Sequence, residues 1–373
     1  MKLLKILFIN LVILLACLEL GSFLYYNLGL SISNYTTSYV SKTYDNDLQW
    51  MTEHNNWGAW HVPNGRAHME RRCFGVELIS NSYGARDIER NMKSEKSRVL
   101  VLGDSFVEGY GVNREKRFTD LLEKKLGREF LNFGTSGSSG PTQYAILYRE
   151  LASKFDHDEV LIAFLPDNDF TDNDPAIWLG DDKTAFNIRY RPYWKRVDGT
   201  NDFEVFYPTD KPKHMVTFGD YRSENQQKGP SLKSRIQRLF WTYGVYREIR
   251  YISRGSTYDD GIYSGYFDGT DEQVDAALFF LKKIKDMAGD KKVSMISIAR
   301  PNDLKRQAET PSPIIARLSA FAAENDIKFV DLAPETLERE TDIKSLYLPC
   351  DGHWSPKGHQ LAADIIANTI FNQ

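Results

Sequence analysis

Five short apolar runs, separated by segments with helical periodicity, constrain the fold of this chain more than any other feature. The strand-like runs are expected at 98–103, 129–133, 159–165, 293–298 and 327–331. The helices are expected at 116–126, 141–154, 272–287, 312–325 and 356–371. Strands that alternate with helices predict a parallel sheet covered on both faces. We therefore expect an α/β fold, a three-layer α/β/α sandwich.

The first of these runs ends in Gly103-Asp104-Ser105. A short apolar run closed by a glycine and a polar turn indicates a buried parallel strand whose carboxyl end reaches the surface. In open α/β sheets, ligands bind at that edge. Ser105 is therefore a candidate nucleophile, although Gly-x-Ser turns after strands are also common structural turns.

Near the end of the chain, Asp351-Gly352-His353 precedes the last expected helix. A serine hydroxyl is a weak nucleophile, which needs a base within hydrogen-bond reach and a carboxylate that fixes the tautomer of the base. Asp351 and His353 could supply both groups. The same residues also fit a simple turn, with Ser355-Pro356 starting the helix, and the two interpretations are compatible.

Two further polar segments follow strand-like runs, one at 134–140 and the other at 166–169. The first contains the spacing Asn132-x-x-x-Ser136-Gly137, and the second contains Asn168. Together with Ser105 they give three strand ends in chain order, and Asp351-x-His353 supplies a fourth block.

These four blocks resemble those of the SGNH hydrolases, also called the GDSL-like lipase and acylhydrolase superfamily. The resemblance covers roughly residues 95–170 and 272–373 and implies a flavodoxin-like sheet, ester hydrolysis, and no metal or organic cofactor. It implies that Ser105 is the nucleophile and that Asp351 and His353 complete a triad. It also implies an oxyanion hole formed by the N–H groups of Ser105 and Gly137 and the side-chain amide of Asn168.

Two departures from the family pattern stand out. The family often separates the acidic residue from the histidine by two residues, whereas here only Gly352 lies between them. The third block usually contains a glycine before the asparagine, and here the segment is Pro166-Asp167-Asn168.

Residues 1–30 differ from the rest of the chain. Lys2 and Lys5 precede a long apolar run that is interrupted by Glu19. The run is long enough to span a bilayer, and lysines on the short side predict a cytoplasmic N-terminus with the body outside, periplasmic or extracellular. We favour an uncleaved signal anchor. The alternatives are a lipoprotein anchored at Cys17, after Leu14-Leu15-Ala16, and a buried helix of a soluble protein.

If the body lies outside the cytoplasm, two of its cysteines could form a disulfide. The chain has three cysteines and no C-x-x-C pair, so a structural zinc site is not expected. Cys73 and Cys350 form either a disulfide, which would tie the N-terminal segment to the Asp351 loop, or two buried thiols.

Two regions surround the alternating core. Residues 31–95 are expected to be a lead-in that packs on the catalytic domain, 96–373, with its tryptophans in the core. Residues 170–271 are an aromatic-rich insertion, either a lid or substrate wall or a small core of their own. It includes a basic helix expected at 232–252, which is either solvated or approaches anionic lipid or an acidic polysaccharide.

Charge and motifs narrow the function to three classes. The formal net charge of −4 gives no electrostatic case for nucleic acid. The first class is an esterase that removes acyl groups from a cell-surface or secreted glycan, through an acyl-enzyme on Ser105. The second is an O-acyltransferase that uses the same triad on a polysaccharide, and the third is a catalytically idle glycan-binding or assembly protein. The sequence does not reveal the oligomeric state.

Overall fold

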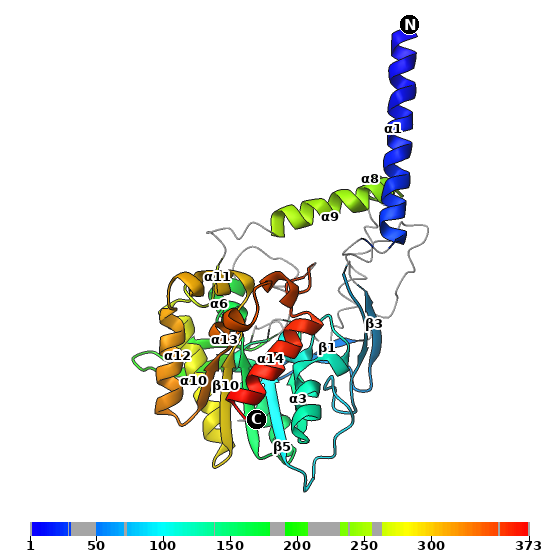
Figure 1. The fold of residues 1–373 in the computed structure, drawn as a ribbon. Helices are drawn as coiled ribbons and strands as arrows, with labels where there is room; N and C mark the ends of the chain where they lie inside the picture. Colours follow the sequence, from blue (N-terminus) through cyan, green and yellow to red (C-terminus); the bar gives the residue numbers. More distant parts are fainter. Residues whose placement is uncertain are drawn as a thin grey trace.

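The structure of the protein is a computed structural model. The structure describes residues 2–28, 30, 50–70, 73–137, 139–179, 191–207, 232–237, 239–255, 263–349 and 351–371. Figure 1 shows a globular body and a long N-terminal helix that projects from it.

The body is built on a five-stranded sheet in the order β11-β10-β7-β5-β6, in which all the strand pairs are parallel. Its strands are β5 (Arg98–Gly103), β6 (Glu129–Gly134), β7 (Glu159–Phe164), β10 (Lys292–Ser297) and β11 (Lys328–Asp331). The five expected strands are therefore confirmed. Numbered by appearance, the sheet order is 2-1-3-4-5, the flavodoxin-like arrangement, in which the chain changes direction between the first and third strands. That switch point lies between β5 and β7.

Helices cover both faces of this sheet. One layer contains α4 (Pro141–Glu150), α10 (Asp271–Ala288) and α12 (Pro313–Glu324). The other contains α3 (Phe118–Leu126), α11 (Pro301–Glu309), α13 (Leu332–Arg339) and α14 (Pro356–Thr369). The expected three-layer sandwich is confirmed, with α11 and α13 as helices that the sequence pattern did not reveal. Short turns of helix complete the domain: α2 (Ser105–Glu108), α5 (Pro166–Asp169), η2 (Arg114–Lys116), η3 (Ala152–Lys154) and η4 (Ile343–Leu346).

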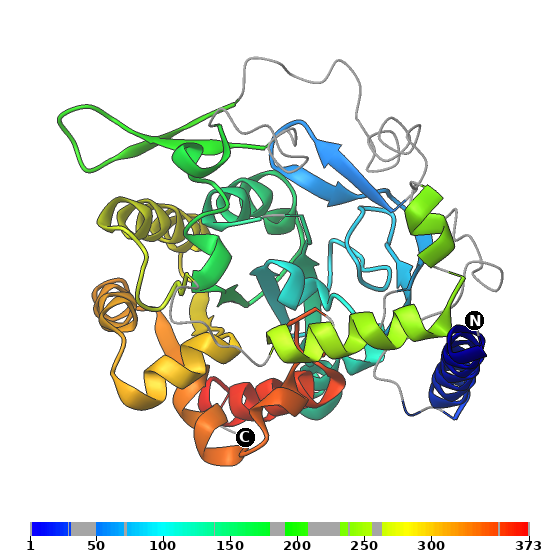
Figure 2. The same cartoon turned by 90° about the horizontal axis from the view of Figure 1, so that it is seen from above.

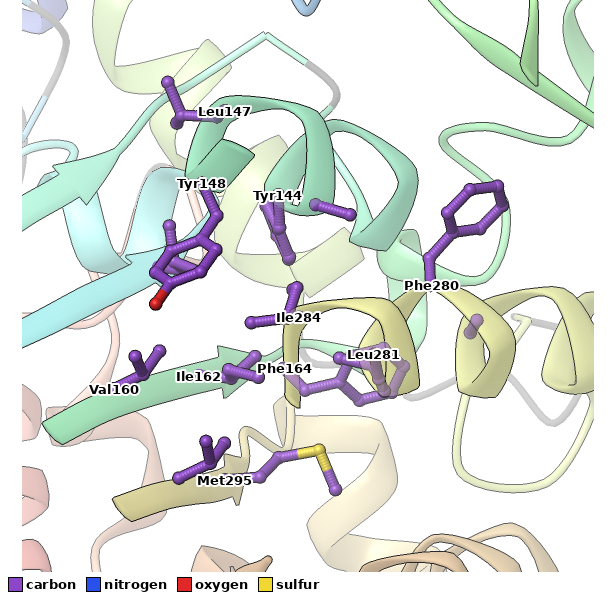
Figure 3. Packing of buried hydrophobic residues seen from close by; sticks show 14 of the residues in the cluster. Tyr144, Leu147, Tyr148, Val160, Ile162, Phe164, Phe280, Leu281, Ile284 and Met295 are labelled. Carbon is purple, nitrogen blue, oxygen red and sulfur yellow. The ribbon is translucent and has the colours of Figure 1, made fainter. Parts of the chain in front are cut away.

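The strands are apolar throughout because both of their faces are buried. In β5, Leu100 and Leu102 belong to the core under α4 and α10, while Val99 and Val101 belong to the core under α3 and α14. Figure 3 shows the first of these cores, where side chains of α4 and α10 meet those of β7 and β10. Because Leu281 is fully buried there, Leu281→Ala should cost about 2–5 kcal/mol of stability.

The lead-in segment forms two hairpins. The first pairs β1 (Met51–His54) with β2 (Gly58–His61), and the second pairs β3 (Arg66–Glu70) with β4 (Gly75–Ile79). Trp57 and Trp60 join the core under α4, whereas Trp50 belongs to a smaller cluster that includes Leu348. All three tryptophans are buried, as expected. The lead-in therefore packs directly on the sheet domain.

The insertion contains α6 (Pro175–Trp178), the hairpin of β8 (Tyr193–Arg196) and β9 (Phe203–Phe206), α8 (Leu232–Gln237) and α9 (Trp241–Gly255). Trp194 and Phe203 pack edge to face and join the core that contains α10. These aromatic side chains are thus buried packing residues and do not line a substrate wall. The prediction of a single basic helix at 232–252 is wrong in one respect. The segment forms two helices, α8 and α9, with a turn at Leu239 between them.

The N-terminal helix α1 (Lys2–Asn27) is long and apolar enough to cross a membrane, and no other helix in the described part of the chain passes the same test. Cys17 lies on this helix as an exposed free thiol. Cys73 is disulfide-bonded. Cys350, its expected partner, lies outside the described residues, so the pairing of these two cysteines stays a prediction.

Candidate active site

Ser105 lies directly after β5, at the switch point of the sheet. Gly103 ends the strand where a Cβ atom would lie 2.9 Å from the carbonyl oxygen of Ala163, on the neighbouring strand. Asp104 then starts the single turn α2, because its Oδ1 accepts a hydrogen bond of 2.9 Å from the N–H of Phe106. This tight strand-to-helix turn fixes Ser105 at the carboxyl edge of the sheet.

The structure brings together the serine, histidine and aspartate singled out in the sequence. Oγ of Ser105 lies 2.7 Å from Nε2 of His353, and Nδ1 of His353 is hydrogen-bonded to Oδ1 of Asp351. The single-residue spacing between Asp351 and His353 is accommodated by Gly352, whose φ of 93° lies in the left-handed region. Leu348 closes this turn, since its N–H donates to the His353 carbonyl at 2.7 Å.

Two aromatic rings hold the imidazole of His353 in place. Its ring centroid lies 4.9 Å from that of Phe106 and 4.6 Å from that of Tyr110. Phe106 belongs to α2 and Tyr110 to the loop that follows it, so the segment that presents Ser105 also positions its partner.

Asn168 lies in α5, at the end of β7, on the other side of the switch point. Its Nδ2 donates to Oδ2 of Asp104 at 3.1 Å. An amide nitrogen has two hydrogens, so one N–H remains to point at a ligand. Burial raises the pKa of Asp104, while hydrogen bonds from Phe106 and Asn168 act in the opposite direction. The missing family glycine therefore does not prevent Asn168 from reaching the serine turn.

Gly137 lies in the turn after β6, with a φ of 106° that favours glycine. Within the described part of the chain, neither the N–H of Ser105 nor that of Gly137 donates a hydrogen bond. Both N–H groups are therefore candidates for binding an oxygen atom of a ligand. Ser136, beside Gly137, is held by the Glu108 carboxylate through its N–H and its hydroxyl.

Glu108 is a site residue that sequence reasoning missed. It is fully buried, and Oε1 lies 3.5 Å from Nε2 of His61. Burial by itself would raise the pKa of Glu108, but the charges of His61 and Arg86 and the hydrogen bond from Ser136 lower it to about 2. The carboxylate therefore stays ionised and holds the Ser136–Gly137 turn. The sequence feature that could have indicated Glu108 is an acidic residue three positions after the candidate nucleophile, Ser105.

Arg86 is a second residue that the sequence did not reveal as part of the site. Its guanidinium is buried and donates to the carbonyl oxygens of Gly109 at 2.6 Å and of Val112 at 2.8 Å. Burial, with the nearby Arg117 charge, lowers its pKa to about 10. The lead-in segment thus reaches across and fixes the loop that follows Ser105.

His359 is a structural residue. It is fully buried on the first turn of α14, and its Nδ1 accepts a hydrogen bond of 3.3 Å from the N–H of Phe118. Burial and the nearby arginines lower its pKa to about 3. The ring is therefore neutral at pH 7 and acts as an acceptor between α3 and α14.

Fold and geometry together define an α/β sandwich with a Ser-His-Asp arrangement at the carboxyl edge of a flavodoxin-like sheet. No protein-family profile and no curated protein matches the sequence. Solved structures similar to the chain include a member of the lipolytic G-D-S-L family from Veillonella parvula. It is 12% identical, with a TM-score of 0.36, over 74% of this chain and 100% of that one.

Two further similar structures have related descriptions. A lipase/acylhydrolase from Enterococcus faecalis is 14% identical, with a TM-score of 0.35, over 74% of this chain and 95% of that one. A carbohydrate esterase family 2 enzyme from Corynascus thermopiles is 13% identical, with a TM-score of 0.37, over 81% of this chain and 76% of that one. Similarity this low carries no information on substrate.

Proposed function

We propose that this protein is a serine-dependent ester hydrolase of the SGNH type. The observation that carries the proposal is the chain of contacts from Ser105 through His353 to Asp351, at the switch point of the sheet. Ligands of open α/β sheets bind at this position, so the contacts lie where a substrate would be.

In the proposed reaction, Nε2 of His353 takes the proton of the Ser105 hydroxyl as Oγ bonds to the carbonyl carbon of an ester. The tetrahedral intermediate then collapses, the ester C–O bond breaks, and His353 returns the proton to the leaving alcohol. Water attacks the acyl-enzyme in the same way and releases the carboxylic acid and free Ser105. Asp351 fixes the imidazole tautomer and stabilises its charged form.

The oxyanion of each tetrahedral intermediate would be bound by the N–H groups of Ser105 and Gly137 and by the remaining N–H of Asn168. A donor of this kind can supply roughly 2.7–4 kcal/mol in the transition state. The hydrogen bonds from Asn168 to Asp104 and from Ser136 to Glu108 support this assignment, because they fix the Asn168 amide and the turn that carries Gly137.

For the substrate, we propose an acylated cell-surface or secreted glycan. The ground for this choice is the expected position of the body outside the cytoplasm, and the buried aromatic residues of the insertion add nothing to it. An O-acyltransferase would use the same acyl-enzyme and differ only in that a sugar hydroxyl resolves it. The idle binding protein is disfavoured by a hydrogen-bonded triad.

For the location, we propose that α1 is an uncleaved anchor and that the body lies outside the cytoplasm. The disulfide at Cys73 supports an oxidising compartment. A lipoprotein anchored at Cys17 is the alternative, and it would lack the first half of α1. Intact-mass analysis of the membrane-extracted protein distinguishes the two.

The test uses the full chain in detergent micelles, supplied with an activated acetyl ester and with acetylated oligosaccharides. Acetate release that a serine-directed organophosphonate abolishes, with the label recovered on Ser105, supports the hydrolase. Acetylated sugar formed only when an acceptor oligosaccharide is present would identify the transferase. Failure of Ser105 to react with the phosphonate or any ester, in folded protein, would overturn the proposal.

A further inference from the structure

Helices α8 and α9 lie beside the base of α1, on the side of the body where the carboxyl ends of the parallel sheet strands lie. In Figure 1, α8 and α9 run roughly across the axis of α1, above α6 and α11, which follow the carboxyl ends of β7 and β10. Figure 2, the view from above, shows α9 crossing over the body on this side. α9 therefore lies at the level where α1 meets the globular domain.

Polar contacts fix α9 to α1. The carboxylate of Glu19 accepts hydrogen bonds from the N–H groups of Trp241 at 2.6 Å and Thr242 at 3.0 Å, at the amino end of α9. The buried Glu248 accepts hydrogen bonds from the hydroxyls of Tyr25 at 2.9 Å and Tyr26 at 3.1 Å. A negative charge at a helix amino terminus is favourable, so Glu19 has a partner that its place in an apolar run did not suggest.

The position of Glu19 gives the depth of this junction. It lies 17 residues after Lys2, which is about 26 Å along a helix. A hydrocarbon core is about 30 Å thick, so Glu19 lies near its outer boundary when Lys2 is at the inner one. The amino end of α9, where Trp241 donates to Glu19, therefore lies at the boundary between lipid and water.

The two helices have the composition of an interfacial helix. Four large side chains of α8 and α9 are about half exposed or more. Their exposed fractions are 74% for Leu232, 49% for Ile236, 54% for Tyr246 and 61% for Ile249. Residues 232–255 contain six Lys and Arg and one Glu, a net charge of +5 in a chain whose net charge is −4. Apolar side chains combined with clustered positive charge are typical of helices that lie in the headgroup region of anionic membranes.

We infer that α8 and α9 are a membrane-surface element, which lies in the headgroup layer of a bilayer that contains anionic lipid. It holds the carboxyl edge of the sheet toward that surface. The chain leaves α9 at Gly255 and, ten residues later, the N–H of Gly265 donates to Oδ1 of Asp167 at 2.7 Å, next to Asn168. Ten residues reach at most about 35 Å, so Gly265, which contacts the residue next to Asn168, lies within that distance of the end of α9. This inference is independent of the proposed chemistry.

The test is a depth measurement on the full chain in lipid nanodiscs. Ile249→Cys is made in a Cys17→Ser background, labelled with a nitroxide, and compared with the same label at Met287→Cys, an exposed position at the far end of α10. Accessibility to oxygen, which partitions into lipid, is measured against accessibility to a water-soluble nickel complex. Discs of phosphatidylcholine are compared with discs that also contain phosphatidylglycerol.

We expect the oxygen-to-nickel ratio at position 249 to be several-fold above that at 287 in the anionic discs, and to fall when phosphatidylglycerol is omitted. Lys233→Glu should reduce the ratio at 249 while hydrolysis of a soluble ester is unchanged. Equal, aqueous ratios at both positions in both discs would overturn the inference. Protection of 249 only after addition of an acidic polysaccharide, or spin–spin broadening between two labelled chains, would also overturn it and indicate a glycan or a second copy instead.

Discussion

The side chains of Asp104 and Asn168 are hydrogen-bonded across 3.1 Å, joining the carboxyl ends of β5 and β7. The two strands are neighbours in the sheet, and the chain changes direction between them. This contact fixes the Asn168 amide against the residue that precedes Ser105. Substitutions of Asp104 and Asn168 therefore test the proposed oxyanion hole.

Asn168→Ala should lower kcat by roughly 10²–10³ because one transition-state donor is lost. Asp104→Asn should have a smaller effect, because the donor remains but is no longer oriented by a carboxylate. Reaction of Ser105 with an organophosphonate should persist in both variants. Wild-type kcat in Asn168→Ala would remove Asn168 from the oxyanion hole.

Ser105, His353 and Asp351 should behave as one unit. Ser105→Ala should lower kcat by about 10⁴–10⁶, His353→Ala should come close to that, and the double variant should be hardly worse than either. Asp351→Asn should cost less, since the nucleophile and base both remain. Steady-state kinetics on an activated ester measures these losses, with circular dichroism to show that each variant folds. Additive losses in the double variant would contradict a shared proton transfer.

Glu108→Ala should destabilise the protein by about 3–5 kcal/mol, because it removes the buried carboxylate that pairs with His61 and accepts the hydrogen bonds of Ser136. The Ser136–Gly137 turn would also lose its anchor, so kcat should fall in whatever protein folds. Urea denaturation gives the stability change, and Lys282→Ala, which removes an exposed ion pair with Asp286, is the matched control. If Glu108→Ala and Lys282→Ala were equally stable, the buried carboxylate would have no structural role.

His359 should make stability depend on pH. Its folded pKa of about 3 lies below the ordinary value of 6.5, so the unfolded chain binds more protons between these values. The stability it supports is full above pH 6.5 and is lost as the pH falls toward 3, by about 1.4 kcal/mol per pH unit. His359→Asn, which keeps an acceptor for the Phe118 N–H, should show a shallower acid slope in denaturation between pH 6 and 4. An imidazole titrating near 6.5 in the folded protein, by nuclear magnetic resonance, would refute this.

The orientation of α1 can be tested with a reporter fused after residue 40. With lysines on the short amino-terminal side, alkaline phosphatase should be active there and green fluorescent protein should not fluoresce. The opposite pattern would place the body in the cytoplasm. Lys2→Glu with Lys5→Glu should weaken the preference, because the positive charges set it.

The strands and the triad could be predicted because each has a local signal: an apolar run, a polar turn after it, and an Asp-x-His before a helix. α11 and α13 were missed because they are short, largely polar helices with few apolar residues on one face. Glu108 and Arg86 were missed because a buried ion acquires its role from partners distant in sequence. The turn within the basic segment depends on how α9 docks against Glu19, which no local pattern contains.

The short connection between Gly255 and Gly265 has a consequence for kinetics. If α9 rests on the bilayer, the catalytic centre stays within roughly 35 Å of the membrane surface. Turnover would then depend on how many acyl groups occupy a given area of the membrane, and hardly on how many are dissolved in the surrounding volume. An ester that remains in the leaflet would be met by lateral diffusion in two dimensions, and its release from the membrane would end its exposure to the enzyme.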